Sequence, residues 1–103
     1  MTCYDRHEWQ EFYNHQIVDS SCRLERLLRL LPAAASDVKV DLEHGLDDLR
    51  GRLNRALAKV EGLRRASDDA WRGAKLHTDA ALKALFEAFE AFEARFLPLM
   101  AAA

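Results

Sequence analysis

The stretch that decides the fold is RGRLNRALAKVEGLRRASDDA, residues 50–70, because it holds either a junction between two helices or the middle of one long helix. Residues 50–65 carry six bases and one acid, whereas residues 37–48 carry five acids and one base. Such a gradient complements the dipole of a helix that ends near residue 65. Ser67 and the two aspartates after it then have the pattern of an N-cap and an acidic first turn. The sequence therefore predicts a break near residue 66.

On both sides of this break the apolar pattern is helical. Apolar residues recur at spacings of four and three, and no segment alternates apolar and polar residues as a half-buried strand does. In the first helix this spacing connects Tyr13, Ile17, Leu24 and Leu27. Thr2 is the expected N-cap, with Asp5 three residues later. Pro32 predicts the end, because proline disfavours helical backbone at the preceding residue.

We therefore predict an all-α protein, an antiparallel three-helix up-down-up bundle that forms a single helical domain over residues 1–103. The expected helices cover residues 3–31, 37–65 and 68–97, whose similar lengths suit a bundle. The alternative is a short helix packed on one long helix, as an oligomeric hairpin or coiled coil, because heptad spacing continues through the break. A continuous helix over residues 37–97 would be roughly 90 Å long, far longer than a compact domain.

Composition narrows the class of protein. Half of the residues are apolar, 31% are charged and the net charge is -2, so the chain is neither disordered by composition nor a polycation. Cys3 and Cys22 are not spaced as a zinc site, a haem attachment site or a disulfide framework. No segment has the pattern of a signal peptide or a membrane span. We expect a cytoplasmic protein with no membrane partner.

No motif in the chain carries catalytic chemistry. There is no nucleophile beside a base, no glycine-rich phosphate loop and no HExxH motif, so we predict no enzyme and no cofactor. The metal candidates are His7, Glu11 and His15, spaced by four on the side of the first helix away from the core. They drift around the helix, so only two neighbours can meet on one ion. The heptad places His77 in the core, where we expect a hydrogen-bonded histidine. We predict metal at none of these positions.

The aromatic residues are more numerous than a three-helix core requires. LFEAFEAFEARF, residues 85–96, repeats phenylalanine every three or four positions, and two aromatic residues widen the apolar stripe of the first helix. Buried aromatic anchors dominate many protein interfaces. We predict a protein-interaction or oligomerisation module, such as an adaptor, a chaperone-like protein or a scaffold, with a homodimer as the expected assembly. The expected contact residues are Trp9, Phe12, Trp71, Phe86 and Phe89.

Two other functions are alternatives on the sequence alone. The first is a bundle that binds a metal or a small ligand, through His77 inside the bundle or through the face of His7, Glu11 and His15. The second is weak binding of nucleic acid through the bases between Arg50 and Arg65. Those bases point in several directions, lack aromatic neighbours and follow an acidic block, so we expect no nucleic-acid partner.

Overall fold

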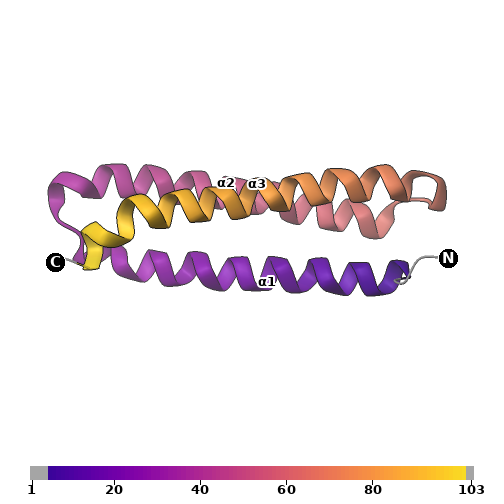
Figure 1. Cartoon of the computed structure of the whole chain (residues 1–103), viewed down its shortest axis with the longest axis horizontal. Helices are drawn as coiled ribbons and strands as arrows, with labels where there is room; N and C mark the ends of the chain where they lie inside the picture. The colour runs from indigo at the N-terminus through magenta and orange to yellow at the C-terminus, as the bar shows by residue number, and fades with distance from the viewer. Residues whose placement is uncertain (1–4, 102–103) are drawn as a thin grey trace.

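The structure is a computed structural model that describes the backbone of residues 5–101 and the side chains of residues 5–99. It contains helices α1 (Arg6–Leu30), α2 (Ser36–Arg65) and α3 (Asp68–Ala101), with a 3-10 turn, η1 (Leu31–Ala33), after α1. The three helices run up, down and up along a rod of 53 × 20 × 17 Å (Figure 1). The predicted three-helix bundle is confirmed. The single long helix is wrong, because the chain reverses at Ala66 and Ser67 and α3 packs against α2.

The helix ends follow local capping chemistry. Asp5 is the N-cap of α1, and its carboxylate accepts a hydrogen bond from Glu8 N at 2.9 Å. The expected cap, Thr2, lies outside the described residues. The Ser67 hydroxyl accepts a hydrogen bond from Ala70 N at 3.3 Å, as the sequence predicted for the start of α3. The predicted end at residue 97 is wrong, because α3 contains Pro98. A proline removes one backbone donor, and the residues after it still bond within the helix.

The phase of the buried seam changes at the break between α2 and α3. On α2 the buried positions alternate by four and three: Leu42, Leu46, Leu49, Leu53, Ala56, Val60 and Leu63. Continuing that spacing would bury Ala70 and His77. On α3 the buried positions are instead Thr78, Leu82, Leu85, Phe89, Phe92 and Phe96. The shift of one residue therefore begins at the break, because α3 is a new helix whose register is set by its own packing.

His77 is consequently exposed, and its predicted place in the core is wrong. Thr78 takes the core position and is fully buried. Its hydroxyl lies 2.8 Å from Ala74 O in the same helix and 3.3 Å from Lys59 O of α2. The hydroxyl hydrogen therefore has an acceptor within α3 and a second one on the neighbouring helix. Because the hydroxyl of a threonine can form a hydrogen bond within its own helix, burying this side chain costs little free energy.

The helices pack unequally around the core. Helix α2 packs against both other helices, whereas α1 and α3 approach each other less closely (Figure 1). A close approach of α2 to α3 depends on Gly45, where an added Cβ would lie 2.7 Å from the ring of Phe92. Among the described residues, no helix is both long and apolar enough to cross a membrane. The less closely packed side between α1 and α3 is where surface remains for a site.

Candidate functional site

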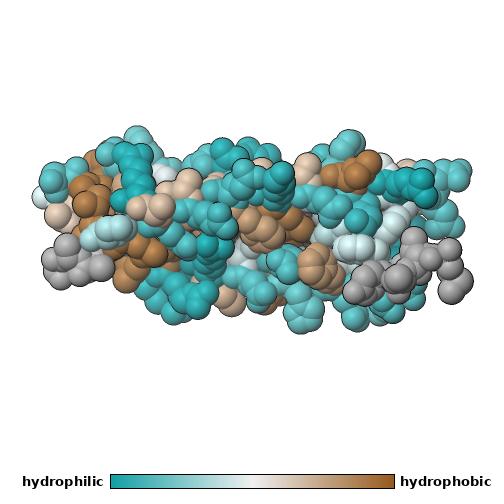
Figure 2. All heavy atoms as spheres, in the orientation of Figure 1, coloured by the Kyte–Doolittle hydropathy of each residue, from teal (hydrophilic) through white to brown (hydrophobic). Residues whose placement is uncertain are grey.

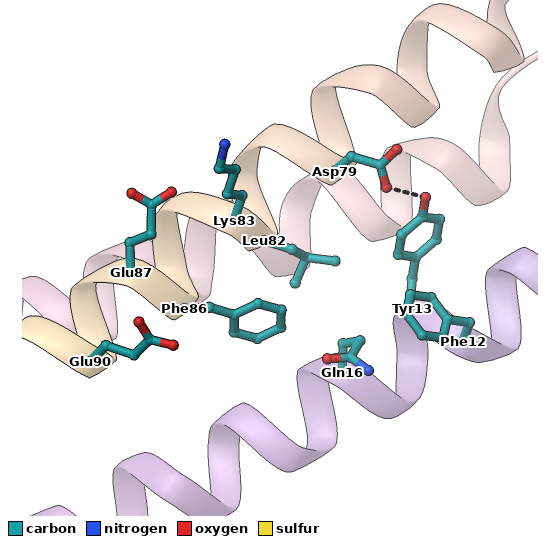
Figure 3. Close-up of a pocket in the computed structure, with 9 residues that line it drawn as sticks. All are labelled: Phe12, Tyr13, Gln16, Asp79, Leu82, Lys83, Phe86, Glu87 and Glu90. Atoms are coloured by element: carbon teal, nitrogen blue, oxygen red, sulfur yellow. Dashed lines mark hydrogen bonds between the residues drawn. The ribbon is translucent and has the colours of Figure 1, made fainter. Parts of the chain in front are cut away.

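Helices α1 and α3 enclose an elongated hollow on the open side of the bundle, which we call the α1–α3 groove. Its first part has a volume of about 300 Å³, and Phe12 and Phe86 lie on opposite walls (Figure 3). A second hollow of about 360 Å³ continues along the same helices past Arg23 and Arg26. Both hollows share Gln16, Phe86 and Glu90. Figure 2 shows apolar surface between the two helices near the middle of the rod, flanked by hydrophilic side chains.

A hydrogen bond from a buried tyrosine joins the two walls near the start of the groove. Tyr13 is fully buried and donates its hydroxyl hydrogen to Asp79 (Figure 3). The other Asp79 oxygen lies 3.0 Å from Lys75 Nζ. That ammonium lies 3.8 Å from the ring centroid of Trp9, and the Trp9 ring stacks on Tyr13. Burial, the hydrogen bond to Asp79 and the charge of Asp79 raise the pKa of the Tyr13 hydroxyl well above its ordinary value.

This shift predicts a loss of stability in alkali. The folded protein keeps Tyr13 protonated, whereas the unfolded chain ionises it near pH 10.0. The contribution of Tyr13 to the free energy of unfolding is therefore fully present below that pH. It decreases as the pH rises above it, by up to about 1.4 kcal/mol per pH unit. At neutral pH, Tyr13→Phe should lower the free energy of unfolding by about 1 kcal/mol. Between neutral and alkaline pH, the free energy of unfolding should then decrease less in Tyr13→Phe than in the wild type. Urea unfolding of both proteins, at neutral pH and above the ordinary tyrosine pKa, measures this. An equal alkaline loss in both proteins contradicts the assignment.

An ion pair joins the same two walls further along the groove. Arg23 and Glu93 form two hydrogen bonds, Nε to Oε2 at 2.7 Å and Nη2 to Oε1 at 2.6 Å. The Arg23 guanidinium also lies 4.7 Å from the ring centroid of Phe89. Hydrogen bonding to Glu93 raises the pKa of this guanidinium further above its ordinary value. Such a bidentate pair holds its two helices in a defined register.

The structure distributes the five predicted contact residues among four environments. Phe12, 48% exposed, and Phe86, partly buried, line the groove. Trp9 is partly buried beside its start. Trp71 is also partly buried but lies in the first turn of α3, near the α2–α3 turn. Phe89 is fully buried in the core, so it has no exposed surface for a partner.

The predicted metal candidates form one pair. His7 Nε2 lies 3.2 Å from Glu11 Oε1, and both side chains are largely exposed. His15 lies in a shallow hollow beside Glu11, and His77 is exposed on another helix. Within residues 5–99, no three side chains of His, Cys, Asp or Glu gather as ligands of one ion. A single pair leaves most of the coordination of an ion to water, which makes for weak binding.

Sequence reasoning missed the polar wall of the groove. Gln16, Asp19 and Lys83 line it, as do Glu87 and Glu90. These positions flank the seams of α1 and α3 on the sides where the two helices meet. Heptad spacing could have identified flanking positions, but it does not show which flank of α3 lies beside α1.

Comparisons with models of known protein families, with curated proteins and with solved structures gave no match.

Proposed function

We propose that this protein is a non-catalytic protein-interaction module that binds a helical partner in the α1–α3 groove. One observation carries the proposal: Phe12 and Phe86 line opposite walls of an elongated hollow between the two helices that pack least closely. A helix laid there would bury both aromatic side chains and complete a four-helix arrangement. The cytoplasmic location expected from the sequence is part of the same proposal.

The dimensions and rigidity of the groove support a helical occupant. From Phe12 to Arg26 the groove wall on α1 extends fourteen residues, which is roughly 21 Å, or about four helical turns. The Tyr13 hydrogen bond to Asp79 and the ion pair of Arg23 with Glu93 tie the two walls together. A groove whose walls are already tied loses little conformational entropy when it is occupied, which favours binding.

The test measures whether the groove binds either a second copy of the chain or a separate helix. The full chain is assayed for self-association by light scattering, and for binding to helices selected from a displayed library of amphipathic peptides. Phe86→Ser and Phe12→Ser should each weaken the association by about tenfold or more, as interface anchors do. Val40→Ser is the matched control, because Val40 is 59% exposed on α2. The proposal fails if the chain neither self-associates nor selects a helix, or if Val40→Ser weakens binding as much as Phe86→Ser.

A further inference from the structure

We propose that the occupant of the α1–α3 groove is a second copy of this chain, packed antiparallel across a two-fold axis. In this dimer, the α1–α3 pair of one copy packs face to face on the α1–α3 pair of the other. The four helices form the centre of the dimer, and each α2 lies on the outside. The inference rests on the proposed function, because it names the partner of the same groove. Three features of the groove face support it: its apolar ends, its charges and its size.

An apolar residue at the start of the groove matches another that lies one turn beyond its far end under such an axis. Phe12 and Leu30 are 48% and 39% exposed, and they lie eighteen residues apart, which is about five whole helical turns. Both therefore project from the same side of α1. A two-fold axis that crosses α1 midway between them brings Phe12 of each copy onto Leu30 of the other.

Helix α3 carries a similar stripe. Leu97, 37% exposed, lies eleven residues after Phe86, which is about three turns, so both residues share one side of α3. Figure 2 shows further apolar surface at the end of the rod where α1 and α3 both terminate. The apolar stripe of this face therefore extends along both helices, beyond the reach of one short peptide.

The charges on this face are of both signs and in an order that suits an antiparallel copy. On α3, Lys83 precedes Phe86 by three residues and Glu90 follows it by four, and both charged side chains are exposed (Figure 3). Antiparallel packing of α3 on its counterpart brings Lys83 of each copy toward Glu90 of the other. On α1, the exposed Asp19 and Arg26 are related in the same way. A different partner helix that was strongly basic or strongly acidic would meet side chains of its own charge at one end of this face.

The size of the face is sufficient for a dimer. One long side of a rod of 53 × 20 × 17 Å offers a surface on the order of the 800 Å² that each partner buries in a standard interface. A two-fold contact of a surface with itself is also closed, so it ends at the dimer and does not form a filament.

The experiment is a charge exchange read out by sedimentation equilibrium of the full chain across the micromolar range. Wild type should be a dimer. Lys83→Glu and Glu90→Lys should each weaken the dimer by about tenfold or more, because the axis places each substitution against like charge twice. The double variant carrying both changes should recover most of the affinity. Lys59→Glu, on the exposed surface of α2, is the control and should leave the dimer unchanged. Circular dichroism verifies that every variant is folded.

Two results would overturn the inference: a monomer throughout this range, or a dimer that the double variant does not restore. Its failure is distinguishable from failure of the proposed function. If the monomer binds a selected amphipathic helix and Phe86→Ser abolishes that binding, the groove is a docking site whose occupant is another protein. If neither association occurs, both proposals fail.

Discussion

Replacing Phe89 by alanine is expected to lower the free energy of unfolding by about 3–5 kcal/mol. Phe89 is fully buried near the middle of the bundle, and the Arg23 guanidinium lies over its ring. Alanine would leave a cavity that helices held by the surrounding core cannot close. Since small domains have total stabilities of about 5–15 kcal/mol, the variant should be close to its unfolding limit. Urea denaturation followed by far-ultraviolet circular dichroism measures the change.

Phe86→Ala is the matched control for this prediction. Phe86 precedes Phe89 by three residues on the same helix, but it is only partly buried and lines the groove. Its replacement should cost about 1 kcal/mol of stability while weakening association through the groove. Equal losses of stability in the two variants would show that the division between core and groove on α3 is wrong.

The second large effect is expected for Arg6→Ala, which should cost about 2–3 kcal/mol. Arg6 Nη2 donates a hydrogen bond to Leu63 O at 3.1 Å and another to Ala66 O, while Nη1 lies 3.0 Å from Asp68. The last carbonyls of a helix lack partners within it and carry the negative end of its dipole. Arg6 of α1 therefore caps α2 and also holds the start of α3. Its removal loosens three helices at one point.

Thermal and urea unfolding of three variants separates these roles. Arg6→Lys keeps the positive charge but loses the fork of donors, so it should fall between wild type and Arg6→Ala. Arg29→Ala removes an exposed guanidinium whose partner, Glu25, is 4.0 Å away, and should change stability by only a few tenths of a kcal/mol. If Arg6→Ala were no more destabilising than Arg29→Ala, the capping role would be excluded.

Much of the fold was predictable because it depends on interactions between residues close in sequence. The charge gradient before residue 65 and the cap at Ser67 predicted the break between α2 and α3, and the structure has it there. The prediction failed for His77, because the heptad of α2 was extended across that break. A new helix takes its register from the surfaces it packs against, so spacing inherited from the preceding helix does not apply.

The candidate site was predictable only in part. An excess of aromatic residues identified Phe12 and Phe86, which line the groove. The same reasoning also selected Phe89, which the structure buries. Phe86 and Phe89 lie about 60° apart around α3, so sequence spacing places both near one face. Which of them is covered depends on where α1 lies relative to α3.

By itself, the sequence determined the helical class, the position of the break and the apolar stripes of α1 and α2, because these follow from capping, charge and periodicity within a few residues. Only the tertiary structure decided which flank of α3 faces α1. That choice joins Tyr13 to Asp79 and Arg23 to Glu93, and it leaves the groove open between them. The partners in these pairs are more than sixty residues apart, and no local preference specifies on which side of α2 the third helix packs.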